Sequence, residues 1–164
     1  MKRVLIAGVG NIFLGDDGFG VEVAARLAGR TMPAGVKVAD YGIRGVHLAY
    51  ELLDGYDGLI LVDAVSRGDA PGTVYVIEPD LDAIENSRGQ MDAHSMSPDT
   101  VFALVKTLGG SLGEVYVVGC EPADVSERMG LSAPVAAAVD VAVTAVCELA
   151  LTMAGRQPER QDVL

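Results

Sequence analysis

Residues 8–20 read GVGNIFLGDDGFG and follow directly on the apolar run VLIA at residues 4–7. A short apolar strand that runs into a glycine-rich turn and then a helix is typical of the first unit of an α/β domain. Such a turn usually holds a phosphate group at the helix N-terminus. Here Asp16 and Asp17 stand at that place, and two carboxylates would repel a phosphate in a poorly solvated site. The stretch therefore predicts an α/β fold whose ligand is not an anion.

The glycines of this stretch also fail to match the dinucleotide-binding motif. That motif is GxGxxG, and Phe13 occupies the position of its third glycine. One aspartate in the turn could serve simply as a helix cap. Two adjacent aspartates, with a further carboxylate expected at the same edge of the sheet, favour a cation site instead.

Short apolar runs and amphipathic stretches alternate along the chain. These patterns predict strands at residues 4–7, 36–39, 59–63, 73–77 and 114–118. They predict helices at residues 19–30, 47–53, 98–108 and 134–154. The connection between the third and fourth strands is too short for a parallel crossover, so we expect the fourth strand to run antiparallel. The prediction is a three-layer α/β/α sandwich with a mixed, mostly parallel five-stranded sheet, in which residues 78–79 lie at the amino edge.

The size and charge of the chain limit its organisation and its partners. The 164 residues, half of them hydrophobic, suit one domain, which we expect to span residues 1–154 before a polar tail at 155–164. The formal net charge of −11 argues against nucleic acid and anionic membranes as partners. We expect a cytoplasmic monomer.

A membrane span and a redox role are both disfavoured. Residues 133–154 are strongly apolar, but they contain Asp140 and Glu148, so we expect a packed core helix and no stable membrane insertion. Cys120 and Cys147 lie outside any CxxC pair. Cys120 follows an apolar run and is interpreted as a small buried hydrophobe, and Cys147 as a core residue.

Acidic residues and one histidine are predicted to gather at the carboxyl edge of the sheet. Strand ends deliver the carboxylates, and the helix that starts at residue 98 brings the histidine to the same edge. The cluster is Asp16, Asp17, Asp40, Asp63 and His94. Carboxylate oxygens with one imidazole suit a borderline divalent ion such as Zn²⁺ or Ni²⁺. The second histidine, His47, stands at a helix start, where we expect a surface or capping role.

Several stretches, in this order, resemble the nickel-iron hydrogenase maturation endopeptidases. The matching stretches are GNIFLGDDGFG at 10–20, DYGIRG at 40–45, LVDA at 61–64, His94 before a Ser-Pro helix start, GCEP at 119–122 and GLS at 130–132. The resemblance covers nearly the whole chain. It implies a mixed five-stranded sheet between helices, in agreement with the pattern of the elements.

The resemblance also implies an activity and a ligand set. These endopeptidases remove a C-terminal extension from the nickel-loaded precursor of the hydrogenase large subunit, which allows active-site closure and assembly. Their metal-binding positions correspond to Asp17, Asp63 and His94, although the choice between Asp16 and Asp17 stays open. The implied ion is nickel supplied by the substrate, with zinc or cadmium able to replace it. Gly18 and Gly20 would let the backbone approach that ion.

Two mechanisms and two other functions stay open. The bound nickel either marks the loaded precursor for recognition or assists hydrolysis directly. Asp40 is either a carboxylate base or a residue that fixes its own loop by hydrogen bonds. A non-catalytic nickel-binding chaperone would keep the same ligands. A phospho-accepting receiver-like module would need a lysine where this chain has Glu121.

Overall fold

One mixed sheet forms the middle layer of the computed structural model, which describes residues 2–82 and 98–155. The strand order is β2-β1-β3-β5-β4, and β4 alone runs antiparallel, against β5. The strands are β1 (Val4–Val9), β2 (Val36–Gly42), β3 (Gly58–Ala64), β4 (Val74–Ile77) and β5 (Glu114–Cys120). The predicted strands and the antiparallel fourth strand are therefore confirmed.

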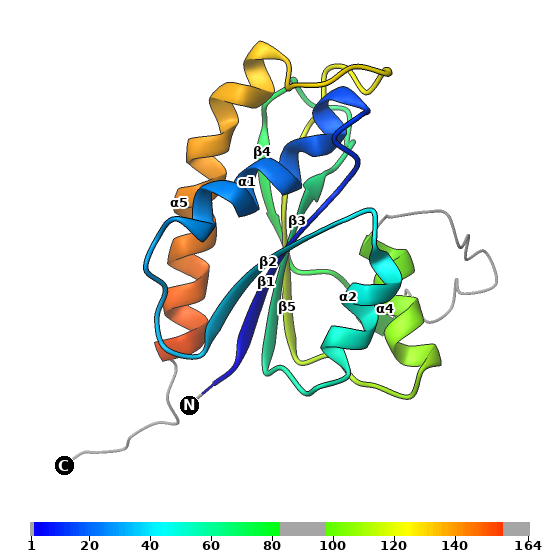
Figure 1. Ribbon diagram of the computed structural model, residues 1–164, viewed down its shortest axis with the longest axis vertical. Helices are drawn as coiled ribbons and strands as arrows, with labels where there is room; N and C mark the ends of the chain where they lie inside the picture. Colours follow the sequence, from blue (N-terminus) through cyan, green and yellow to red (C-terminus); the bar gives the residue numbers. More distant parts are fainter. Residues whose placement is uncertain (1, 83–97, 156–164) are drawn as a thin grey trace.

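Helices cover both faces of this sheet (Figure 1). A short 3₁₀-helix, η1 (Gly15–Gly18), leads into α1 (Phe19–Ala28). This helix and α5 (Ala133–Gly155) lie on one face, and α2 (Gly45–Leu52) and α4 (Pro98–Thr107) lie on the other. The three-layer α/β/α sandwich predicted from the sequence is thus confirmed.

The central strands carry two separate hydrophobic cores. Neighbouring residues of a strand point to opposite faces, so Leu5 packs toward α2 and α4 while Ile6 packs toward α1 and α5. Every residue of β1 is buried. This double burial explains why β1 is a continuous apolar run without the alternation of a half-exposed strand.

Helix α5 belongs to the core of the domain. It is long and apolar enough to cross a membrane, and it is the one such helix in the described part of the chain. Its residues Val139, Val143 and Val146 are buried at helical spacing against the sheet, whereas Val141 and Leu151 are exposed. The predicted role as a packed core helix is confirmed.

The short β4 corrects the expected course of the chain. Its register runs from Val74 opposite Cys120 to Ile77 opposite Val117, so β4 ends opposite the midpoint of β5 and does not reach the amino edge. The expectation that residues 78–79 lie at the amino edge was therefore wrong. Pro79 lacks a backbone N–H for the ladder, which accounts for the early end of the strand.

The glycines of the first turn allow α1 to pack closely on the sheet. A Cβ on Gly20 would collide with the carbonyl oxygens of Val9 and Val62, and a Cβ on Gly8 would collide with the carbonyl oxygen of Gly20. Gly20 therefore serves the close packing of α1 on the sheet, and the expectation that Gly18 and Gly20 let the backbone approach an ion stays a prediction. Helix packing is thus a physical reason for the glycines at positions 8 and 20 of this turn.

Candidate active site

A cleft of about 760 Å³ opens at the carboxyl edge of β3. Its walls come from the turn after β1, the end of β3, the end of β4 and the start of α4. The lining includes Asn11, Leu14, Asp17, Ile43, Asp63, Val65, Ser66, Ile77, Pro79, Pro98, Asp99 and Phe102. The predicted carboxylates Asp17 and Asp63 therefore share one cleft.

Asp63 lies at the base of this cleft and is only 5% exposed. Its Oδ1 accepts a hydrogen bond from Ala64 N at 2.8 Å. Burial, followed by the negative charge of Asp17, raises the pKa of Asp63 well above the usual value of an aspartate. A buried carboxyl group next to a second carboxylate is stabilised either by a proton or by a cation.

Asp17 is placed by the backbone of the glycine-rich turn. Its Oδ2 accepts a hydrogen bond from Asn11 N at 2.8 Å. Gly10 has φ of +134°, and a Cβ there would collide with the Asp17 carbonyl oxygen. Residue 10 must therefore be glycine for Asp17 to lie where it does.

Sequence reasoning missed the role of Asn11. Its backbone N–H holds Asp17, and its side-chain Oδ1 accepts a hydrogen bond from Phe13 N at 2.9 Å. A side-chain contact to the backbone two residues further on is the usual behaviour of asparagine in turns. The Gly-Asn pair was therefore the available signal.

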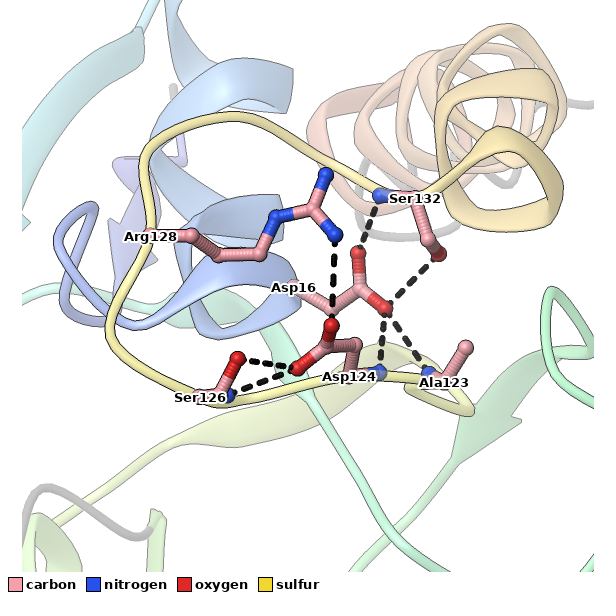
Figure 2. A network of polar contacts seen from close by, with 6 residues as sticks. All are labelled: Asp16, Ala123, Asp124, Ser126, Arg128 and Ser132. Carbon is pink, nitrogen blue, oxygen red and sulfur yellow. Dashed lines mark hydrogen bonds and ion pairs between the residues drawn. The ribbon is translucent and has the colours of Figure 1, made fainter.

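The neighbouring Asp16 is fully buried and points toward Ala123, Asp124 and Ser132 (Figure 2). Its Oδ2 accepts hydrogen bonds from Ala123 N at 2.8 Å, Asp124 N at 2.9 Å and Ser132 Oγ at 2.8 Å. Its Oδ1 accepts one from Ser132 N at 2.7 Å. Burial would raise the pKa of Asp16, but hydrogen bonds from Ser132, Asp124 and Ala123 hold it below the usual value. The two adjacent aspartates thus have different surroundings, and only Asp17 lines the cleft.

Asp40 lies outside the lining of the cleft and is exposed. Its Oδ1 accepts a hydrogen bond from Gly42 N at 2.8 Å, and its backbone oxygen accepts one from the Arg44 guanidinium at 2.7 Å. Gly42 in turn accepts a hydrogen bond from Gly10 N at 2.9 Å. Asp40 therefore fixes the loop after β2, and a role as a base stays a prediction.

The two predicted histidine positions differ in what the structure shows. His47 is exposed on α2, as its predicted surface role requires. His94 lies outside the described residues. Within residues 2–82 and 98–155, no three His, Cys, Asp or Glu side chains converge to hold a metal ion. The structure thus brings together two of the three expected ligands, Asp17 and Asp63.

Cys120 ends β5 and Glu121 follows it, close to the same edge of the sheet. Burial, followed by the charges of Asp16 and Glu121, raises the pKa of the Cys120 thiol to about 11. The thiol is fully buried, which agrees with its predicted role as a small hydrophobe. Cys147 is partly buried and packs against the α5 core, so its assignment to the core holds in part.

Glu121 anchors the segment between β3 and β4. Its Oε1 accepts hydrogen bonds from Tyr75 OH at 2.5 Å and Arg67 N at 2.8 Å. The hydrogen bond from Tyr75, followed by that from Arg67, lowers the pKa of Glu121. Val65 and Ser66, at the start of the same segment, line the cleft. Glu121 therefore helps to shape the cleft from outside it.

The fold and the site together define an α/β protein with a paired-carboxylate cleft at the carboxyl edge of a mixed sheet. Residues 21–149 match the family described as hydrogenase maturation protease (HycI). The chain belongs to the hydrogenase maturation protease family, whose members are endopeptidases.

Individual relatives agree with this assignment. The hydrogenase expression/formation protein HupD of Rhodobacter capsulatus is 33% identical over 152 residues, which cover 90% of this chain and 71% of that protein. The crystal structure of a hydrogenase 2 maturation peptidase from Thaumarchaeota archaeon SCGC_AB-539-E09 superposes with a TM-score of 0.70 at 34% identity, covering 90% of this chain and 97% of that one. The maturating endopeptidase HybD of Escherichia coli superposes with a TM-score of 0.75 at 28% identity, covering 93% and 94%.

Proposed function

We propose that this endopeptidase removes the C-terminal extension from the nickel-loaded large-subunit precursor of a nickel-iron hydrogenase. The observation that carries the proposal is the juxtaposition of Asp17 and Asp63 in one cleft, where burial and mutual charge raise the pKa of Asp63. A cation between the two carboxylates would stabilise the ionised form of both, because it offsets their mutual repulsion. A nickel ion in the precursor would supply that cation.

The proposed ligands of the ion are Asp17, Asp63 and His94. The first two line the cleft, as does Pro98, which follows His94 by four residues in the sequence. Four residues of chain reach at most about 14 Å. Two carboxylates and one imidazole suit nickel, and the same donors accept zinc or cadmium in its place. Three protein ligands leave open positions for the groups of the precursor.

The two carboxylates would first distinguish nickel-loaded precursor from metal-free precursor. A precursor without nickel presents no cation, so its docking leaves Asp63 protonated or repelled by Asp17. A loaded precursor favours the ionised form of Asp63 and binds both carboxylates. The ion itself would supply Lewis-acid polarisation at the scissile bond. Asp40 would act by holding the end of β2 and the residues that follow it, since it accepts hydrogen bonds from Gly42 N and from the Arg44 guanidinium.

The remaining assignments follow from the charge and the fold. The net charge of −11 supports a protein that binds neither nucleic acid nor anionic membranes, and we propose a cytoplasmic location. We propose that it acts as a monomer on its precursor. The antiparallel β4 and the family membership argue against the receiver-like alternative. A non-catalytic chaperone remains the competing function, because it would use the same ligands.

Cleavage of purified precursor tests the proposal against that competitor. Nickel-loaded and metal-free precursors are incubated with the protein, and the loss of the extension is followed by mass spectrometry. We expect cleavage of the loaded precursor only, abolished by Asp63→Asn and by His94→Ala but retained by the control His47→Ala. Equal cleavage of both precursors would refute nickel recognition, and binding without any mass loss would identify a chaperone.

A further inference from the structure

The turn η1 contacts residues 121–132, the loop between β5 and α5, through backbone and side-chain hydrogen bonds. Figure 2 shows the side-chain hydrogen bonds of Asp16. Gly15 N donates to Arg128 O at 2.8 Å, and Asp16 N donates to Asp124 O at 2.8 Å. Gly15 has φ of +57°, and a Cβ there would collide with the Asp124 carbonyl oxygen. The 121–132 loop therefore packs directly on the turn that carries the cleft carboxylate.

The side chains of Asp16 and Asp17 leave this turn in different directions. A 3₁₀-helix has three residues per turn, so neighbouring side chains lie about 120° apart around its axis. Asp16 points into the 121–132 loop, whereas Asp17 lines the cleft with Asp63. A rotation of η1 that withdrew Asp16 from the loop would also turn Asp17 away from Asp63.

The hydrogen bond that Asp17 accepts within its own turn does not fix the orientation of its whole carboxylate group. Asn11 N donates to Asp17 Oδ2 at 2.8 Å. One hydrogen bond fixes one carboxylate oxygen but not the direction of the second oxygen. That direction depends on the orientation of the η1 backbone, and the buried Asp16 side chain connects this backbone to Ala123, Asp124 and Ser132.

We propose that Asp16 is a positioning residue, which holds η1 against the 121–132 loop and thereby aims the Asp17 carboxylate at Asp63. This inference rests on the proposed function, since it concerns the same pair of carboxylates. The side-chain hydrogen bonds of Asp16 come from Ala123, Asp124 and Ser132, which do not line the cleft. Asp16 acts through Asp17, in the way that an outer hydrogen-bonding partner orients a metal ligand.

The variant Asp16→Asn tests this role. An asparagine keeps one acceptor oxygen but turns an NH₂ group toward backbone and hydroxyl donors, so at least one of the four hydrogen bonds is lost. Two properties of the purified full chain are measured. Amide hydrogen exchange measures the protection of four backbone amides in the metal-free protein, those of Ala123, Asp124, Ser132 and Asn11. Calorimetric titration with Cd²⁺, without precursor, measures the metal affinity.

We expect all four amides to exchange faster in Asp16→Asn and the Cd²⁺ affinity to fall about 10- to 100-fold. The Asn11 amide is the decisive readout, because it donates to Asp17 and not to Asp16. A purely structural role of Asp16 would expose the amides of the 121–132 loop and leave the Asn11 amide protected.

Two controls separate positioning from lost charge and from lost stability. Asp124→Asn removes the same charge from the same network, but its carboxylate contacts Ser126 and Arg128 and not Asp16 (Figure 2). Val143→Ala weakens the α5 core without touching the turn. Both controls should keep the Asn11 protection and the Cd²⁺ affinity of the unaltered protein.

The outcomes are distinct for the inference and for the proposed function. Unchanged Asn11 protection in Asp16→Asn overturns the inference, whatever the metal data show. Unchanged Cd²⁺ affinity in Asp16→Asn, with binding lost in Asp63→Asn, also overturns it and leaves the metal site standing. If Asp16→Asn does not fold, the variant Ser132→Ala tests the inference instead. It removes the Ser132 hydroxyl, one of the four hydrogen-bond donors to the Asp16 carboxylate. We expect roughly threefold weaker Cd²⁺ binding and faster exchange of the Asn11 amide. Values equal to those of the unaltered protein would overturn the inference.

Discussion

Asp63 and Asp17 face the same cleft, and their juxtaposition holds the pKa of the buried Asp63 well above the usual range of an aspartate. Burial is the larger cause and the charge of Asp17 the smaller one. The folded chain therefore binds a proton at Asp63 more tightly than the unfolded chain does. This relationship makes the stability of the metal-free protein depend on pH in a direction that can be measured.

Asp63→Asn should stabilise the metal-free protein at neutral and alkaline pH. Because the pKa is raised on folding, the contribution of Asp63 is fully present below the unfolded value near ~3.9 and is lost as pH rises through the folded pKa. Asparagine imitates the protonated form and can keep the hydrogen bond from Ala64 N. We expect a melting temperature at least about 2 °C higher near neutral pH.

The pH series supplies the control for this prediction. The difference between Asp63→Asn and the unaltered protein should shrink as pH falls below the folded pKa of Asp63, where both side chains are neutral. The exposed Asp54→Asn makes the same charge change and should leave the melting temperature unaltered. A lower melting temperature for Asp63→Asn near neutral pH would contradict the raised pKa.

Gly10→Ala and Gly42→Ala should differ sharply in their effect on stability. Gly10 has φ of +134°, and a Cβ there would collide with the Asp17 carbonyl oxygen. We therefore expect Gly10→Ala to lower the free energy of unfolding by about 3 kcal/mol or more. At Gly42 the nearest atoms are 3.8 Å away and only the positive φ of +52° opposes alanine, which costs about 1–2 kcal/mol. Urea unfolding of both variants measures the difference, and equal losses would show that Asp17 tolerates a shift of its backbone.

Asp40→Asn and Asp40→Ala distinguish a base from a residue that fixes a loop. Asparagine cannot act as a carboxylate base, but its oxygen can still accept the hydrogen bond from Gly42 N. We expect Asp40→Asn to cleave the precursor at close to the normal rate and Asp40→Ala to be roughly fivefold slower. Equal and severe loss in both variants, with Cd²⁺ binding intact, would instead identify Asp40 as the base.

Cys120 should be chemically inert in the folded protein. Burial and the charges of Asp16 and Glu121 raise the pKa of its thiol to about 11, so little thiolate forms near neutral pH. Iodoacetamide should therefore label the partly buried Cys147 first, as peptide mass spectrometry would show. Cys120→Ala should still cleave the precursor. Rapid labelling of Cys120 in the folded state, or loss of cleavage in Cys120→Ala, would revive a cysteine nucleophile.

Much of the fold could be predicted from local patterns. The five strands and the four helices appear with shifts of a few residues at their ends, because apolar periodicity depends on neighbouring residues alone. The antiparallel β4 followed from the short connection after β3. The end of β4 at Ile77 was predicted, but its position opposite Val117 was not, because the register of a strand depends on its partner strand.

The sequence by itself determined the α/β/α sandwich and the placement of Asp17 and Asp63 at one edge of the sheet, because both follow from element order and strand direction. Only the tertiary structure showed which of the two adjacent aspartates, Asp16 or Asp17, lines the cleft. Adjacent aspartates are chemically equivalent in the sequence, and their roles diverge because the distant Ala123, Asp124 and Ser132 bind one of them. The raised pKa of Asp63 has the same origin, since burial and the nearby Asp17 charge exist only once the chain has folded.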